Sequence, residues 1–335
     1  MKAYQLAASN EPLVLVDLPD RKPEPTEVVV KLRCAALNHR DVWIQKGVYH
    51  TMKFPVITGA DGAGVVSVVG SEVDQNWLHK EVIINPGVGW GSSEFKADPA
   101  FAPLGTPRDG TFADQIVIPA AQLVHKPAFL SWEEAAALPI GGVTAYRALF
   151  SRANLQANEN VLITGIGGGV AQFAILFAKA VGARVLGTSS SEEKMRQAKD
   201  LGVELLANYR EKDWADQLQK AVPVGFDIVF DSAVGPDFQK IIDLCAPGGR
   251  IVFFGVTAGR LATIDMQTVY RQQLTILGTK SGSPRDFQAM VDFVEKHKIK
   301  PVIDRVMPIS EINQAFSLVD QGKQFGKIVF KISQD

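Results

Sequence analysis

A glycine-rich stretch at residues 164–171 has the residue types and spacing of a phosphate-binding turn. Glycines let the backbone turn tightly, and they let a pyrophosphate approach the amide groups at the start of a helix. An apolar run at 161–164 precedes the stretch, and apolar residues at helical period follow it. We therefore expect a dinucleotide site here. Its predicted contact residues are Gly165, Gly167, Gly168, Gly169 and Val170.

Glycine-rich turns also occur where a strand is merely joined to a helix, so the glycines alone are weak support for a nucleotide site. The surroundings strengthen the interpretation. A second apolar run, at 184–188, ends about twenty residues after the turn, which is the arrangement of a dinucleotide-binding βαβ unit.

The end of that second run indicates which nucleotide binds. An NAD enzyme offers an acid there to the ribose hydroxyls, whereas this chain has Ser189. A serine that only caps the helix beginning near residue 192 is the alternative, but capping does not explain the missing acid. Hydroxyl and ammonium donors suit a 2′-phosphate, so we predict NADPH as the cofactor. The predicted contacts are Ser189, Ser190, Lys194 and Tyr209.

The composition is that of an ordinary globular protein. The chain has 335 residues, which is long enough for two domains, and its formal net charge is -1. With no basic excess, we expect a small-molecule substrate and neither nucleic acid nor a membrane as a partner. Cys34 and Cys245 are far apart and suggest buried thiols. No leader-like segment opens the sequence and the apolar runs are short, so we expect a cytoplasmic protein.

The elements that must position these residues fall into two groups. Short β-branched runs separated by Pro and Gly predict a mostly antiparallel β domain in the first third. They lie at 13–16, 28–32, 64–69, 81–85 and 115–118. A capping box at Ser131 and Glu134 then predicts the start of a helix.

Further along, apolar runs alternate with helical segments, which predicts a doubly wound parallel sheet. The runs lie at 161–164, 184–188, 205–208, 227–231, 250–255 and 274–277. A last run at 327–332 is expected to complete the β domain of the first third.

Several motifs, in the same order, resemble those of the medium-chain dehydrogenase/reductase superfamily over nearly the whole chain. They lie at 28–41, 55–64, 110–113, 138–149, 164–171 and 322–331. The resemblance implies an α/β fold, with a GroES-like β domain at 1–140 and 278–335 and a Rossmann domain at 141–277. It also implies hydride transfer in a cleft between the domains, and a homodimer formed through the edge of the sixth strand. The further cofactor contacts that it implies are Thr144, Gly255, Val256, Thr257, Gly278 and Thr279.

Zinc enzymes of this superfamily hold a catalytic metal at three positions, which match Asn38, Ala60 and Ile140. Zinc requires thiolate, imidazole or carboxylate ligands, and these residues provide none. Residues 86–103, which match the lobe that holds a structural zinc, contain no cysteine. We therefore predict that no residue of this chain binds a metal.

The zinc-free branch, which includes quinone oxidoreductases, is similar to this chain at Asn38, Asp41, Gly47 and Tyr49, although His39 replaces a proline. The resemblance makes Asn38 and Tyr49 candidate catalytic donors to a substrate carbonyl oxygen. A turn-forming Asn38 and a half-buried loop Tyr49 are the structural alternatives. Asp41 completes the predicted catalytic set and is expected mainly to anchor the loop.

The roles of His39 and Arg40 stay open between substrate, cofactor phosphate and solvent, and Asp61 is expected to pair with one of them. The predicted function is NADPH-dependent, zinc-independent reduction of quinones or α,β-unsaturated carbonyl compounds. The alternatives are an alcohol or aldehyde dehydrogenase of the zinc-type family, and an NADPH-binding protein with little catalysis.

Overall fold

The structure is a computed structural model that describes residues 1–49 and 52–332. The chain forms two compact units, residues 1–141 with 282–335 and residues 142–281. The second unit ends at residue 281 rather than at the predicted 277. The turn after its last strand stays with the sheet because the amide of Thr279 donates to the carbonyl of Phe253 at 3.0 Å.

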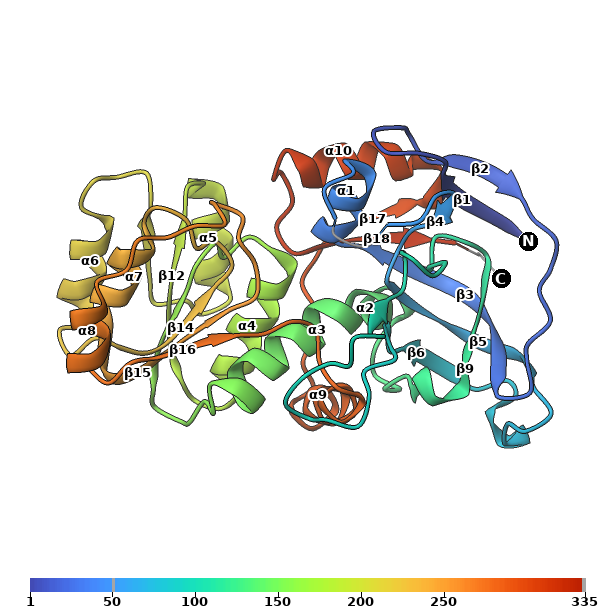
Figure 1. The fold of residues 1–335 in the computed structure, drawn as a ribbon, viewed down its shortest axis with the longest axis horizontal. Coiled ribbons are helices and arrows are strands. Elements are labelled where there is room, and N and C mark those ends of the chain that lie inside the picture. Colours follow the sequence, from blue (N-terminus) through green and yellow to red (C-terminus); the bar gives the residue numbers. More distant parts are fainter. Residues whose placement is uncertain (50–51, 333–335) are drawn as a thin grey trace. The chain divides into compact units, whose positions relative to one another are not determined.

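The first unit is built on a seven-stranded sheet that combines strands from the first 125 residues with two strands from the C-terminal part of the chain (Figure 1). Its order is β10 (Leu123–His125), β6 (Glu81–Ile84), β5 (Asp61–Val69), β3 (Glu27–Leu37), β18 (Lys327–Lys331) and β17 (Ile303–Pro308), and β9 (Gln115–Pro119) also pairs with β3. The C-terminal strand β18 runs antiparallel to β3, which confirms that the last apolar run completes this sheet.

Smaller elements surround that sheet. A second sheet has the order β2 (Val14–Asp17), β1 (Lys2–Leu6) and β4 (Val56–Ile57), and a third pairs β7 (Gly87–Val88) with β8 (Ala102–Pro103). The helices of this unit include α1 (His39–Gln45), α2 (Trp132–Ala137), α9 (Pro284–His297) and α10 (Ile312–Asp320), and α3 (Pro139–Tyr146) begins in it. The capping box predicted at Ser131 is present, and α2 lies against β3 and β5.

The second unit is a six-stranded parallel sheet, and all six strands were predicted. The order is β13 (Leu205–Asn208), β12 (Arg184–Ser189), β11 (Asn160–Ile163), β14 (Phe226–Asp231), β15 (Cys245–Phe253) and β16 (Thr275–Gly278). Strands β11 to β13 are added in one direction across the sheet and strands β14 to β16 in the other. Ligands are therefore expected at the carboxyl ends of β11 and β14, where the order of addition reverses. This order confirms the doubly wound Rossmann prediction.

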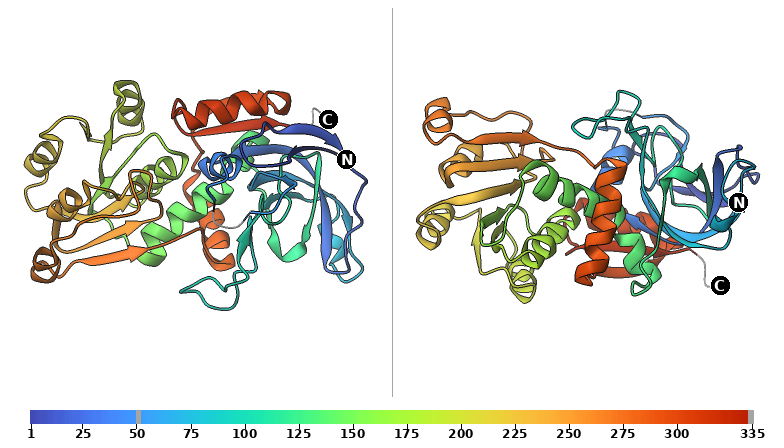
Figure 2. Two further views of the ribbon diagram at one scale, coloured as in Figure 1. Left: turned by 45° about the horizontal axis from the view of Figure 1, so that its top comes forward. Right: turned by 90° about the horizontal axis from the view of Figure 1, so that it is seen from below.

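Helices pack around this sheet (Figure 2). They are α4 (Gly169–Ala180), α5 (Glu192–Asp200), α6 (Trp214–Ala221), α7 (Phe238–Asp243) and α8 (Met266–Arg271). Trp214 and Leu218 of α6 and Phe238 of α7 pack on strand residues such as Leu162 and Val229. Because side chains alternate across a strand, Val161 and Ile163 point to the other face.

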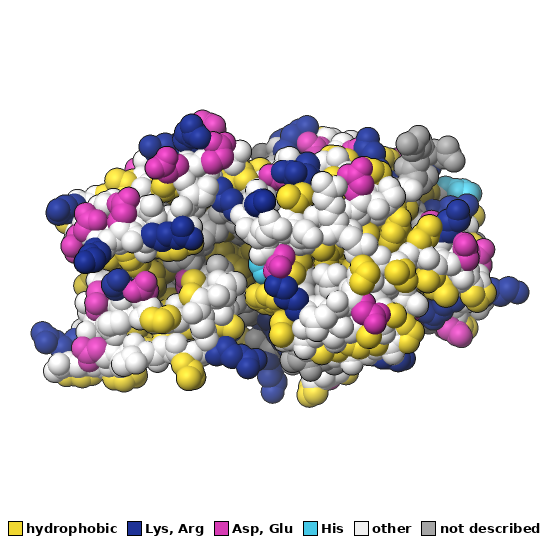
Figure 3. All heavy atoms as spheres, turned by 90° about the horizontal axis from the view of Figure 1, so that it is seen from above, with side chains coloured by type: hydrophobic (Ala, Val, Ile, Leu, Met, Phe, Trp, Pro, Cys, Tyr) yellow, Lys and Arg dark blue, Asp and Glu magenta, His cyan; other side chains and the backbone are white. Residues whose placement is uncertain are grey.

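Cys34 and Cys245 are buried free thiols, as expected, and burial raises the pKa of each to about 12. On the face shown in Figure 3, basic and acidic side chains are interspersed. None of the helices in the described part of the chain is long and apolar enough to span a bilayer.

Candidate active site

The glycine-rich turn follows β11 and is fixed to the end of β12. Gly165 has a φ of +62°, in the left-handed region. Its amide donates to Thr188 Oγ1 at 3.3 Å, and the amide of Ile166 donates to the Thr188 carbonyl at 3.1 Å. Helix α4 begins at Gly169, and its N-cap, Gly168, has no side chain to accept from the first-turn amides. An anion such as pyrophosphate fits this helix start.

Lys194 lies across the same turn. A Cβ added at Gly167 would be 2.5 Å from Cδ and 3.1 Å from Nζ of Lys194, so a side chain at this position would displace the end of the lysine. The predicted hydroxyl residues are nearby. The Ser189 hydroxyl accepts from the Ser191 amide at 3.2 Å, and Tyr209 donates to the Ser190 hydroxyl at 2.8 Å.

The capping alternative accounts for a different serine. Ser191 is the N-cap of α5 and accepts from the amide of Lys194 at 3.4 Å. The cap therefore does not use Ser189, which stands at the end of β12 where an NAD enzyme would have an acid.

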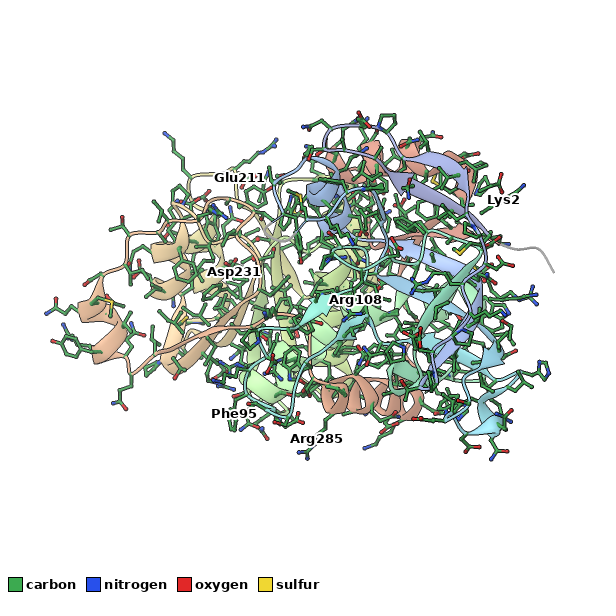
Figure 4. The ribbon with its side chains drawn as sticks, turned by 45° about the vertical axis from the view of Figure 1, so that its right-hand side comes forward. Lys2, Phe95, Arg108, Glu211, Asp231 and Arg285 are labelled. Atoms are coloured by element: carbon green, nitrogen blue, oxygen red, sulfur yellow. The ribbon has the colours of Figure 1, made fainter. Side chains whose placement is uncertain are left out.

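Asp231, labelled in Figure 4, organises the other strand ends of this unit and was not singled out from the sequence. It is buried at the end of β14. One carboxylate oxygen accepts from Thr164 Oγ1 at 2.5 Å, and the other accepts from the Val234 amide at 2.8 Å. This ties the entrance of the glycine turn to the next strand end.

The remaining predicted cofactor residues also belong to this unit. Thr257 donates through its hydroxyl to the Ser232 carbonyl at 3.1 Å, which places the turn that contains Gly255, Val256 and Thr257 beside β14. Gly278 is the last residue of β16, and Thr144 is buried in α3. The Thr279 hydroxyl is buried and has no hydrogen-bond partner among the described residues.

In the first unit, Asn38 is part of a group of buried charges. Lys327 donates to Asp61 Oδ2 at 2.8 Å and to Asn38 Oδ1 at 2.5 Å. Asn38 in turn donates to Asp61 Oδ2 at 2.9 Å, and the Ile140 amide donates to Asp61 Oδ1 at 2.8 Å. Asp61 and Lys327 are both buried, so the pair is shielded from water.

The expected pairing of Asp61 with His39 or Arg40 is therefore wrong. Sheet register explains the actual partner, because β5 pairs Asp61 with Ala36 and β18 pairs Ile328 with Leu37. Both strands thus bring a charged residue to the end of β3, where Asn38 follows. His39 is exposed and packs edge-on against Trp43, with ring centroids 5.0 Å apart.

These contacts do not fit a catalytic zinc ion. The Asn38 amide oxygen is bound by an ammonium group, Ala60 has no donor atom, and Ile140 directs its backbone N–H at Asp61. The Lys327 charge lies beside the nearest carboxylate, where it would repel a divalent cation. In the part of the chain that the structure describes, no three His, Cys, Asp or Glu side chains are grouped as metal ligands.

Arg40, Asp41 and Tyr49 lie next to this group. Asp41 Oδ2 accepts from the Asn38 amide at 3.0 Å, which is the geometry of a loop anchor. Complete burial raises the pKa of Asp41 to about 6, although Arg40 and the Asn38 amide oppose the rise. Arg40 donates through Nη1 to the Leu104 carbonyl at 2.7 Å, and its guanidinium carbon is 5.0 Å from the Tyr49 ring centroid.

Replacing Lys327 by Met would leave the Asp61 carboxylate buried without a cation. We expect Lys327→Met to lower the free energy of unfolding by about 3–5 kcal/mol, measured by urea denaturation. Lys331→Met is the matched control. This lysine lies on the same strand and is itself exposed, although it pairs with Glu133, so its replacement should cost less than about 1 kcal/mol. Equal losses in the two variants would contradict a structural role for the buried pair.

The raised pKa of Asp41 predicts a pH dependence of stability. Its ordinary pKa is 3.8 and its folded value is about 6, so between these values the folded chain holds a proton that the unfolded chain has lost. Stability from this group therefore falls as the pH rises from 4 to 6, by roughly 3 kcal/mol. Asp41→Asn removes the titration, so the difference in unfolding free energy between wild type and variant should change over this window. Parallel curves would refute the assignment.

Comparisons with known proteins agree with this architecture. Residues 24–128 match the family model described as "Alcohol dehydrogenase GroES-like domain", and residues 169–296 match "Zinc-binding dehydrogenase". The chain is 35% identical over 340 residues to "Zinc-type alcohol dehydrogenase-like protein YogA" of Leptosphaeria maculans, covering 96% of this chain and 95% of that protein. It is 28% identical to an acryloyl-coenzyme A reductase of Sulfurisphaera tokodaii, over 99% of this chain and 100% of the relative.

Solved structures are similar over the same length. One, described as an NAD-dependent alcohol dehydrogenase, has a TM-score of 0.93 and 37% identity, covering 99% of this chain and 100% of that one. Another is described as the 2-octenoyl-CoA carboxylase reductase CinF in complex with NADP and 2-octenoyl-CoA. It has a TM-score of 0.87 and 25% identity, covering 100% of this chain and 88% of that one. The chain therefore belongs to the medium-chain dehydrogenase/reductase superfamily of oxidoreductases.

Proposed function

We propose that the chain is an NADPH-dependent, zinc-independent reductase of α,β-unsaturated carbonyl compounds or quinones. The observation that carries this proposal is the buried ion pair of Lys327 and Asp61. This pair contacts two of the residues that match the metal-ligand positions of the zinc enzymes, because it binds the Asn38 side chain and accepts from the Ile140 amide. A reaction that needs only hydrogen-bond donors at a carbonyl oxygen suits this site better than alcohol oxidation at a metal.

The second unit provides a suitable cofactor site. The amides of Gly169 and Val170 at the start of α4 would hold the pyrophosphate, and Lys194, Ser189 and Tyr209 would hold the 2′-phosphate. NADPH supplies a hydride for an electron-poor carbon. The structural relative CinF is described with NADP bound, which supports this choice.

The first unit provides donors for the substrate oxygen. Asn38 uses one amide hydrogen on Asp61 and keeps the second for a ligand. Its amide oxygen accepts from the Lys327 ammonium, which polarises the amide and strengthens its remaining donor. Tyr49 would donate a proton or a hydrogen bond as negative charge develops. The similarity to an acryloyl-coenzyme A reductase supports a substrate with a conjugated double bond.

Alcohol oxidation is the second candidate, because a structure at 37% identity is described as an NAD-dependent alcohol dehydrogenase. Oxidation of NADPH should be followed with quinones, enones, aldehydes and ketones, with NADH in parallel and with and without a chelator. We expect the protein to turn over enones or quinones, and we expect the rate to be the same with and without the chelator. Stoichiometric zinc in the purified protein, or turnover of simple aldehydes only, would contradict the proposal.

The cofactor assignment has its own variant. Ser189→Asp places a carboxylate beside the proposed 2′-phosphate position, so we expect the KM for NADPH to rise about ten-fold or more while that for NADH does not. Ser71→Asp, at an exposed serine of the other unit, should change neither the KM for NADPH nor the KM for NADH. A wild-type preference for NADH would show that the assignment is wrong.

We also propose a homodimer formed at the β16 edge. Among the described strands, β16 pairs only with β15, which leaves backbone groups open on its other side. Met266 and Tyr270, on the helix before this strand, are 64% and 68% exposed. Tyr270→Glu should lower the mass measured by light scattering to that of one chain. Phe95→Glu is the control, at an exposed aromatic of the other unit that is labelled in Figure 4. A monomeric wild type would refute the dimer.

A further inference from the structure

The guanidinium group of Arg40 is held rigidly in the first unit. Its side chain is only 9% exposed. One nitrogen, Nη1, donates to the Leu104 carbonyl, and the Tyr49 ring covers the group at 5.0 Å. Gly105 comes so close that a Cβ there would be 3.2 Å from Nη1. The position of the charge is thus set by three separate neighbours.

The other two nitrogens of Arg40 are not used within the described part of the chain. Both Nε and Nη2 are buried, and neither has a hydrogen-bond partner there. These two nitrogens form one edge of the planar guanidinium group, with parallel N–H bonds. That edge matches the two oxygens of a carboxylate. Buried donors without an acceptor are costly, so the site favours a ligand that supplies one.

Among the described residues, the acids around Arg40 do not satisfy its Nε and Nη2 donors. Lys327 already compensates Asp61. Asp41 Oδ1 is 3.5 Å from Arg40 Nη1, too far for a strong hydrogen bond, and burial raises the pKa of Asp41 to about 6. Above pH 6 Asp41 is mainly ionised, but the contact of its carboxylate is with Nη1 of the guanidinium group. A carboxylate at the Nε and Nη2 edge would accept from the two donors that Asp41 does not bind.

We propose that the Nε and Nη2 edge of Arg40 binds a carboxylate on the substrate, so that the preferred substrates are conjugated carbonyl compounds that also carry a carboxylate. This inference rests on the proposed reductase function. A cofactor phosphate offers similar oxygens, and the test below separates the two sources. The sequence alone left Arg40 undecided because nothing local shows that Leu104 and Tyr49 enclose it.

The test compares a keto-enoate with its methyl ester, which share one carbon skeleton and differ in charge. We expect the wild type to favour the acid by about ten-fold or more in kcat/KM, which is the effect of one charge-assisted hydrogen bond. Arg40→Met should abolish that preference, and Arg40→Lys should keep part of it, because an ammonium retains charge without the paired donors. The KM for NADPH should stay unchanged in both.

Arg108→Met is the matched control, since Arg108 is an exposed arginine of the same unit, labelled in Figure 4, and the preference should survive its loss. Thermal unfolding of each variant separates misfolding from lost recognition, and Arg40→Lys covers the case in which Arg40→Met does not fold. Equal turnover of acid and ester by the wild type, or a change confined to the KM for NADPH, would overturn the proposal.

A binding measurement keeps the two proposals distinguishable. Calorimetric titration of the wild type with the saturated keto acid should show binding that Arg40→Lys weakens and the methyl ester does not reproduce. If no enone is reduced but this binding is found, the reductase proposal fails and the carboxylate site stands. If enones are reduced and this binding is not found, the carboxylate site is wrong.

Discussion

The ion pair between Lys327 and Asp61 connects segments that are 266 residues apart in the chain. A buried charge without its partner is strongly unfavourable, so each of these residues is stable in its place only when the other lies beside it. Because Asp61 begins β5 and Lys327 begins β18, the pair fixes how both strands lie against β3. The orientation of the Asn38 amide follows from it, since both of its polar atoms contact the pair.

The second unit uses the same principle with a single carboxylate. Asp231 at the end of β14 accepts from Thr164 at the end of β11 and from the backbone that follows its own strand. Strand ends in a parallel sheet carry the ligand-binding turns, so a buried acceptor there sets the start of the glycine-rich turn. In both units a buried aspartate holds the backbone, and more exposed side chains are left for the ligand.

Local patterns predicted most of the fold. The six parallel strands, the capping box at Ser131 and the glycine-rich turn each depend on residues close together in sequence, and all are present. Strand β17 was missed because two adjacent charged residues, Asp304 and Arg305, interrupt its apolar residues and it ends in proline. Two long-range partners were missed for another reason: Lys327 is 266 residues from Asp61 and Thr164 is 67 residues from Asp231, so strand register brings them together and no short segment contains them.

The discontinuous first unit has a consequence for how the protein is made. All residues of the unit 142–281 leave the ribosome before β18 does, so this unit has its complete sheet while translation continues. Asp61 is synthesised 266 residues before its partner Lys327. Until β18 is made the first sheet lacks a central strand, and Asp61 is favoured to stay hydrated. Nascent chains would thus be able to form the unit that carries the proposed dinucleotide site first, and the group around Asn38 only after β18 has been made.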